Sequence, residues 1–372
     1  HPTQTIQRLV VKCGSSVLTD DRGRLLKDRL NRLAAEVSSA SSGRQVVLVS
    51  SGAIACGMAQ LGLKRRPREI SQLQACAAIG QSELMHLYTR MFGRHGLLTA
   101  QLLLTQEDLA SRVRFRNAKQ TLLTLLHHRV IPIINENDTV AVEEITFGDN
   151  DRLAALVASG VDAQLLVLLS DVDGFIQDGK LVERVETLRS LRASVPQGTK
   201  RETTKGGMAS KLEAAKIVGH SGIPLVVANG TRPAVLTDLL AGKPIGTLFV
   251  PSRSRLTSRK WWIAFALRQP KGAVVVDAGA AEAVLAKGKS LLPSGVQQVK
   301  GIFEAGAFVV LADGNGTEFA RGKCNFSSSE LARIRGMKST AAAQAIGRAR
   351  IQEVVHRDNL VLAAELHQEH AS

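Results

Sequence analysis

The sequence predicts an α/β fold with a mainly parallel sheet, followed by a small β-rich domain. Apolar runs rich in Val, Ile and Leu alternate with helical segments, and the run from Gln164 to Ser170 is too apolar for an edge strand. Beyond Gly272 the pattern changes to short strands separated by glycine-rich turns, which is typical of a small β-rich barrel. A chain of 372 residues is long enough for both domains.

The elements of the first domain alternate along the chain. A strand begins at Arg8, and the later strands are expected at Gln45–Val49, Thr99–Leu104, Val130–Ile134, Gln164–Leu169 and Ile223–Ala228. Helices are expected at Lys27–Ser39, Gln72–Phe92, Asn117–His128, Leu153–Ser159 and Ser210–Gly219. A strand, a helix and a strand in succession imply right-handed parallel crossovers. Strands of the second domain are expected at Ala273–Asp277, Val299–Phe303, Phe308–Ala312 and Glu318–Lys323.

Composition narrows the class of protein. Aromatic residues make up only 3% of the chain, so the core must consist of Leu, Val, Ala and Ile. The four cysteines show no CxxC spacing, which argues against a zinc site or a disulfide framework and favours a reducing cytosol. The sequence has no secretory signal and no membrane-spanning apolar run, and a cytoplasmic location is therefore expected.

The net charge of +15 raises the possibility of nucleic-acid binding. Residues 1–270 contain 36 Lys and Arg against 23 Asp and Glu, whereas residues 271–372 contain 12 against 10, a surplus of only 2. The surplus gathers in Lys64–Arg68, Arg112–Arg116 and Arg253–Lys260, without the interleaved aromatic residues of a single-strand binding surface. A solvated face, or attraction for small anionic substrates, explains it at least as well.

Two lysines indicate a site for a polyphosphate. Lys12 lies where the first strand runs into a Gly-Ser turn, although the GxxxxGK[ST] pattern of a P-loop is absent from the sequence. Further along, glycines precede a predicted helix that carries Lys211 one turn inside. A lysine at a helix N-terminus opposes the helix dipole, which favours a functional role for Lys211.

Polar clusters indicate a second binding region for a small polar molecule. Asn135–Asp138 ends a buried strand, and Phe147–Asp151 opens a helix shortly afterwards. Any one of these residues could simply cap the helix, but two clusters so close together favour a ligand site. The turn Ser50–Ala53 ends another strand in a similar way. Asp171 and Asp173 are either turn residues before Gly174 or ligands of a ribose or its metal.

Phosphoryl transfer is the reaction class that suits these parts, because it requires positioning and charge neutralisation and no covalent nucleophile. The motifs, in order, resemble those of the glutamate 5-kinases of the amino-acid kinase superfamily: Lys12-Cys-Gly-Ser-Ser, Val49-Ser-Ser-Gly-Ala-Ile-Ala, Asn135-Glu-Asn-Asp, Gly148-Asp-Asn-Asp, Leu169-Ser-Asp-Val-Asp-Gly and Gly206-Gly-Met-Ala-Ser-Lys. Residues 273–358 resemble a PUA domain through Ser290–Val296 and Ala320–Ser328.

The resemblance implies a three-layer αβα sandwich with a mainly parallel sheet, plus a PUA barrel. It implies a catalytic domain at 6–252, a linker at 253–271, a PUA domain at 272–358 and a tail at 359–372. The implied reaction is ATP-dependent phosphorylation of the glutamate γ-carboxylate, the first step of proline biosynthesis. A carboxylate is already ionised at neutral pH, so the absence of a candidate general base is consistent with this reaction.

The resemblance also assigns residues. Lys12 and Lys211 are expected to neutralise the transferred phosphoryl group, and Asp151 to hold both lysines. Glutamate is expected to bind Ser51, Asp138 and Asn150, with Asp138 facing its ammonium group. The ATP-binding positions are expected to be Lys12, Gly14, Ser170, Asp171, Lys205, Gly206, Gly207, Met208, Ala209, Ser210 and Lys211. The sequence offers no compact set of metal ligands, so Mg²⁺ is expected to arrive with the nucleotide.

Two positions depart from the family pattern. Lys205 replaces a small residue, and the segment after Gly174 lacks the usual Tyr and Asp-Pro loop. The resemblance further implies inhibition by proline and assembly into a dimer or tetramer. Two alternatives stay open: a sibling kinase acting on N-acetylglutamate, aspartate or UMP, and RNA binding through the PUA domain, which the nearly balanced charge of residues 271–372 disfavours.

Overall fold

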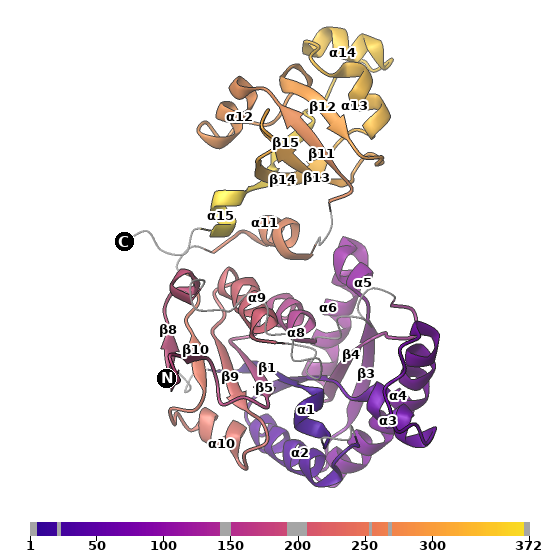
Figure 1. Cartoon of the computed structure of the whole chain (residues 1–372), viewed down its shortest axis with the longest axis vertical. Coiled ribbons are helices and arrows are strands. Elements are labelled where there is room, and N and C mark those ends of the chain that lie inside the picture. Colours follow the sequence, from indigo (N-terminus) through magenta and orange to yellow (C-terminus); the bar gives the residue numbers. More distant parts are fainter. Residues whose placement is uncertain are drawn as a thin grey trace. The chain divides into compact units, whose positions relative to one another are not determined.

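The structure is a computed structural model that describes residues 6–20, 24–141, 150–191, 207–252, 255–266 and 270–367. It divides into two compact units, His1–Arg255 and Leu256–Ser372, each with its own sheet (Figure 1). Each unit is described by itself.

The first unit is built on an eight-stranded sheet in the order β3-β4-β2-β1-β5-β9-β10-β8. The six strands from β3 to β9 are parallel, while β10 runs antiparallel to β9 and parallel to β8. The strands are β1 (Arg8–Cys13), β2 (Gln45–Ser50), β3 (Thr99–Leu104), β4 (Ile131–Glu136), β5 (Leu165–Ser170), β8 (Arg184–Val185), β9 (Leu225–Asn229) and β10 (Thr247–Phe249). The predicted mainly parallel sheet is confirmed.

Helices cover both faces of this sheet, which gives the predicted three-layer αβα arrangement. One layer contains α2 (Lys27–Ser41), α4 (Ile70–Gly93) and α10 (Val235–Leu240), and the other contains α6 (Arg112–His127), α8 (Asn150–Gly160) and α9 (Met208–Gly219). Figure 1 shows α8 and α9 on one side of the sheet and α2 and α10 on the other. The remaining elements are α1 (Ser15–Leu18), α3 (Ala53–Gln60), α5 (Gln106–Ala110), β6 (Ile176–Gln177), β7 (Lys180–Leu181) and η1 (Leu188–Leu191).

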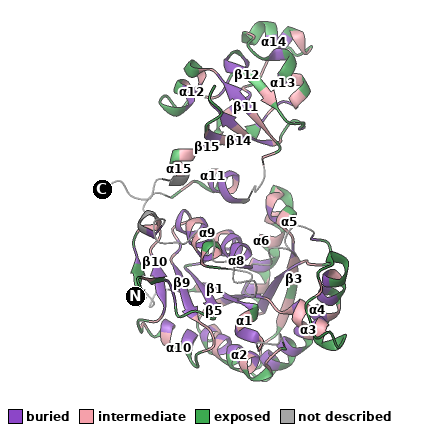
Figure 2. Cartoon of the chain, viewed as in Figure 1, coloured by how far each residue is buried: buried purple, intermediate pink, exposed green. Residues whose placement is uncertain are grey.

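The central strands are buried on both faces, as Figure 2 shows for β1, β5 and β9. Val, Leu and Ile dominate these strands because helices exclude water from both sides of the sheet. The parallel strands all end at the same edge, where Cys13, Ser50, Glu136 and Ser170 lie. Polar residues that follow these strands therefore converge, as ligand sites of open α/β sheets do.

Two glycines bring α3 and α4 into backbone contact. A Cβ atom added to Gly57 would lie 1.8 Å from the carbonyl oxygen of Cys76, and one added to Gly80 would lie 1.8 Å from that of Ala53. Real atoms cannot approach so closely, so only glycine fits at either position. The contact fixes α3, which begins directly after the Ser50-Ser51-Gly52 turn, against the longer α4.

The second unit contains a five-stranded mixed sheet in the order β12-β11-β13-β14-β15, in which only the β11–β13 pair is parallel. Its strands are β11 (Gly272–Val276), β12 (Val296–Lys300), β13 (Phe308–Ala312), β14 (Glu318–Cys324) and β15 (Val355–Leu362). Its helices are α11 (Ser258–Trp261), η2 (Trp262–Ala266), α12 (Ala278–Leu285), η3 (Pro293–Gly295), α13 (Ser328–Ile334), α14 (Ser339–Ala345) and α15 (Ala363–His367). A separate apolar core, which includes Val274 and Phe326, holds it together.

The segments on either side of this sheet are part of the second unit. Both α11 and η2 contact β15, and Lys260 of α11 forms an ion pair of 2.5 Å with Glu365 of α15. Described helices therefore lie within the segment expected as a linker, and described structure extends beyond residue 358. In the described part of the chain, no helix is long and apolar enough to cross a membrane.

Replacing Gly80 tests the α3–α4 contact. We expect Gly80→Ala to lower the free energy of unfolding by about 3 kcal/mol, because the new methyl group must push the two helix backbones apart. Gly93→Ala is the matched control in the same helix, since its Cβ would meet nothing within 4 Å and should be neutral or slightly stabilising. Urea unfolding measures both variants; equal stabilities would contradict the contact.

Candidate active site

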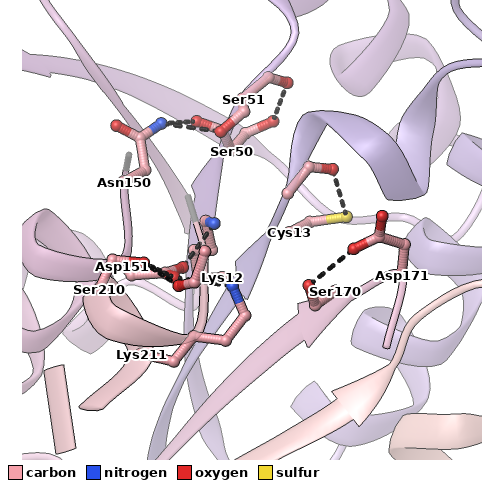
Figure 3. A network of polar contacts seen from close by, with 12 residues as sticks. Lys12, Cys13, Ser50, Ser51, Asn150, Asp151, Ser170, Asp171, Ser210 and Lys211 are labelled. Atoms are coloured by element: carbon pink, nitrogen blue, oxygen red, sulfur yellow. Dashed lines mark hydrogen bonds and ion pairs between the residues drawn. The ribbon is translucent and has the colours of Figure 1, made fainter. Parts of the chain in front are cut away.

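A buried aspartate between two lysines forms the centre of the site. Asp151 Oδ1 lies 2.5 Å from Lys12 Nζ, and Asp151 Oδ2 lies 3.1 Å from Lys211 Nζ. The Asp151 side chain is fully buried, and the Lys12 and Lys211 side chains are 8% and 4% exposed. Ser210 Oγ donates a further hydrogen bond of 3.0 Å to Asp151 Oδ2 (Figure 3). Two cations thus share one anion, and the group carries a net positive charge.

The fold explains why these side chains meet. Leu9, Val11 and Cys13 of β1 belong to the core on one face of the sheet, so Lys12 points to the opposite face, which α8 and α9 cover. Asp151 is the second residue of α8, and Lys211 is the fourth residue of α9. The end of one strand and the first turns of two helices therefore supply all three groups.

Electrostatics keeps Asp151 ionised. Burial raises the pKa of its carboxyl group, but the positive charges of Lys12 and Lys211, together with their hydrogen bonds, outweigh burial and lower that pKa from 3.8 to about 2. A charged carboxylate at neutral pH is what two adjacent ammonium groups require. The neighbouring Cys13 is no nucleophile, because burial raises the pKa of its thiol to about 12 despite the opposing charge of Lys12.

A second group of polar side chains surrounds Asn150, the residue before Asp151. Asn150 Nδ2 lies within hydrogen-bond distance of three acceptors: the carbonyl oxygen of Ser50 at 2.6 Å, Asn135 Oδ1 at 2.9 Å and Ser51 Oγ at 3.0 Å. Figure 3 shows Asn150 beside Ser50 and Ser51, next to the group around Asp151. The structure thus brings the predicted residues Ser51 and Asn150 together.

Sequence reasoning missed the residues behind this second group. Asn135 Nδ2 donates to Gln81 Oε1 of α4 at 2.9 Å, and the hydroxyl groups of Ser50 and Tyr88 lie 2.7 Å apart. Gln81 and Tyr88 lie on the apolar stripe of α4, where both are buried. A polar glutamine on such a stripe was the available signal, since buried amides need partners. Gln81 fixes the amide of Asn135, which in turn orients Asn150.

The other predicted nucleotide positions lie at two further points. Ser170 Oγ donates to Asp171 Oδ1 at 3.1 Å, and Figure 3 shows this pair apart from the group around Asp151. Gly14 N donates to the carbonyl oxygen of Leu169 at 3.1 Å, and a Cβ atom on Gly14 would lie 3.6 Å from Lys12 Nζ. The glycine therefore leaves space in front of that ammonium group.

The start of α9 leaves similar space. Gly207 precedes the helix in an extended conformation, and a Cβ atom there would meet no described residue within 4 Å. Met208, Ala209, Ser210 and Lys211 form the first turn. This open turn and the two lysines fit a phosphate chain, because backbone N–H groups and ammonium groups would face it together. Lys205 and Gly206 lie outside the described residues.

Asp138 lies in the turn that follows β4 and is half-buried. The Arg66 guanidinium group interacts with it electrostatically: burial lowers the pKa of Arg66, and the negative charge of Asp138 opposes that change. The basic cluster Lys64–Arg68 thus contributes at least one side chain near the predicted acceptor region. Within the described residues, no three His, Cys, Asp or Glu side chains gather in a way that could hold a metal ion.

The pH dependence of stability should reveal Asp151. The pKa of its carboxyl group is lower in the folded chain, at about 2, than its ordinary value of 3.8, so ionisation stabilises the fold above pH 4 and this contribution is lost as the pH falls through about 2. Between about pH 5 and about pH 1, the free energy of unfolding of the wild type should fall by about 2 kcal/mol more than that of Asp151→Asn. Parallel profiles in urea unfolding would contradict this charge arrangement.

Comparison with known proteins identifies the family of this chain. Residues 7–229 match the Amino acid kinase family, and residues 272–346 match the PUA domain. Proteins named Glutamate 5-kinase are similar over almost their whole length. That of Pelobacter propionicus is 47% identical over 365 residues, covering 96% of this chain and 98% of the relative, and that of Geobacter metallireducens is 48% identical over 367 residues with the same coverage. The one from Moorella thermoacetica is 45% identical over 364 residues, or 96% of both chains. On the two family matches and the similarity over nearly the whole chain, the chain belongs to the amino acid kinase family and, within it, to the glutamate 5-kinases that carry a PUA domain.

Proposed function

We propose that this chain transfers the γ-phosphoryl group of ATP to the γ-carboxylate of L-glutamate, which gives glutamyl 5-phosphate and ADP in the first step of proline biosynthesis. The full-length similarity to proteins named Glutamate 5-kinase supports this substrate. The observation that carries the proposal is the pair of buried ammonium groups of Lys12 and Lys211 around Asp151, because it supplies charge neutralisation and no general base.

Phosphoryl transfer to a carboxylate requires little beyond charge neutralisation and positioning. The γ-carboxylate is ionised at neutral pH, so its oxygen can attack the γ-phosphorus directly while the bond to the β-phosphate oxygen breaks. The main obstacle is repulsion between two anions. Lys12 and Lys211 neutralise charge on the transferred group, and Asp151 holds both ammonium groups in position, where the buried environment strengthens their effect.

Glutamate lies on the side of Asn150 and Ser51. Asp138 pairs with its ammonium group, and Arg66 lies near enough to Asp138 to interact with it electrostatically. The chain of amides from Gln81 through Asn135 to Asn150 fixes the orientation of the group that faces the substrate. Such preorganised hydrogen bonds reduce the cost of positioning the acceptor.

ATP occupies the side of the two lysines. Gly14, Ser170 and Asp171, together with the segment Lys205–Lys211, form its binding positions. Mg²⁺ accompanies the nucleotide and supplies additional neutralisation of the phosphate charge. The open space before Lys12 and at Gly207 supports a phosphate chain at this point.

The proposal also covers the location, the assembly and the inhibition of the enzyme. The enzyme works in the cytoplasm as a homo-oligomer, a dimer or tetramer, and proline inhibits it. A nucleic-acid partner is not expected for the PUA-like part, since residues 271–372 carry a surplus of only 2 positive charges.

An assay of ATP turnover with a panel of acids tests the reaction. Glutamate should support turnover well above the levels seen with aspartate, N-acetylglutamate and UMP, and proline should reduce the rate. Turnover with glutamate no higher than with buffer would overturn the proposal, and faster turnover with another acceptor would identify a sibling kinase.

Substitutions should separate the two sides of the site. Lys211→Ala should lower kcat by about 100-fold or more with a smaller effect on the KM for glutamate, because it removes charge stabilisation of the transferred group. Asp138→Ala should mainly raise the KM for glutamate, by about tenfold or more. Lys243→Ala, which removes an exposed lysine paired with Asp238, is the control and should change neither. If both site variants lowered kcat and raised the KM for glutamate to the same extent, the assignment would be contradicted.

A further inference from the structure

A cavity lies at the edge of the large sheet opposite the candidate active site. A cavity of about 1130 Å³ is lined by the residues at which β1, β2 and β4 begin, Arg8, Gln45 and Ile131, together with the ends of α2 and α6. Because these strands are parallel, their starts lie a strand length away from the carboxyl edge that carries Lys12 and Ser51. The cavity is therefore separate from the active site.

The lining of this cavity is electropositive. It includes three arginines and two histidines, and none of the described lining residues is Asp or Glu: the basic residues are Arg8, Arg44, His95, His127 and Arg129. Helix C-termini attract cations, and α2 and α6 both end here, which accounts for part of this charge. The three arginines differ, however, in whether their guanidinium groups reach a hydrogen-bond acceptor.

Within the described residues, two of the three arginines have no side-chain partner: Arg44, which is half-buried, and Arg129, which is exposed. Arg8 donates to the carbonyl oxygen of Val161 and, at 2.8 Å, to Gln45 Oε1. The side chains of Arg44 and Arg129 form no hydrogen bond or ion pair with any residue that the structure describes, and Arg44 Nε is buried without an acceptor. A buried guanidinium donor without an acceptor is costly, and a bound anion is one way to satisfy it.

Arg129 also occupies an unfavourable backbone conformation. Its φ is +57°, the left-handed region, and it follows α6 at the position where glycine is usual. Its N–H group bonds to the carbonyl oxygen of Leu126, and that of Val130 to Leu125, which closes the helix in the ordinary way. A glycine would adopt this conformation without strain, so an arginine at this position lowers the stability of the fold.

We propose that this cavity is a binding site for a small polyanion, a phosphorylated metabolite with two or more negative charges, held between Arg44 and Arg129. The planar guanidinium fork is suited to bidentate contact with phosphate oxygens. A volume of about 1130 Å³ leaves room for an organic group beyond the phosphates. The occupant binds at the opposite ends of the strands that carry Lys12 and Ser51, so it takes no part in phosphoryl transfer.

Calorimetric titration of the full chain with inorganic tripolyphosphate tests this proposal at physiological salt. The variant Arg44→Gln/Arg129→Gln should bind one equivalent of tripolyphosphate fewer than the wild type, or should bind that equivalent at least about tenfold more weakly. The control Arg112→Gln/Arg116→Gln removes the same charge from exposed positions at the other end of α6 and should bind as the wild type does. An unchanged isotherm for the first variant, or an equal loss in the control, would overturn the site.

A second measurement uses the strained backbone. Arg129→Gly should raise the melting temperature while it weakens tripolyphosphate binding by about tenfold, since it relieves the left-handed residue and removes a ligand. Ala234→Gly is the matched control, because Ala234 is exposed, has φ +56° and lies outside the cavity lining. It should raise the melting temperature without changing binding. Unchanged binding by Arg129→Gly would overturn the proposed role of Arg129.

Discussion

The site depends on one buried charge, that of Asp151. A carboxylate without exposure to water is stable there only because two ammonium groups accompany it, and the lysines are tolerated only because the carboxylate is present. The three groups come from β1, α8 and α9, so their ion pairs also join one strand to the helix layer above it. With two positive charges against one negative, the group remains attractive to a phosphate in a place where water screens little.

The start of α8 connects the two substrate regions. Asn150 and Asp151 are neighbours in the first turn, yet Asn150 contacts Ser50, Ser51 and Asn135 while Asp151 contacts the lysines. Any shift of this turn would move both groups together. In the proposed function, the spacing between an acceptor beside Asn150 and a phosphate beside Lys12 would therefore be set by the backbone of one helical turn.

Much of the fold could be predicted from sequence because buried parallel strands are continuous apolar runs. Thr99–Leu104 and Phe308–Ala312 have the predicted bounds. Elements fixed by tertiary partners could not be predicted: β8 has two residues that pair with β10, and β15 depends on β14. In the site, the motifs singled out Lys12, Asp151 and Lys211, which the structure brings into contact, while their roles in catalysis stay a prediction. Gln81 was missed because its role depends on an amide 54 residues away in the chain, which no local pattern reveals.

The glycine contact between α3 and α4 has a consequence for motion. Helix α3 starts directly after Ser51, and α4 carries Gln81, so the backbone contact at Gly57 and Gly80 makes these two parts of the acceptor region move as one rigid body. Packed helices with interlocked backbones slide or bend little. If substrate entry requires the acceptor region to open, the displacement must arise at the joints of this helix pair, in the turn before Ala53 and in the segment that follows Gly93.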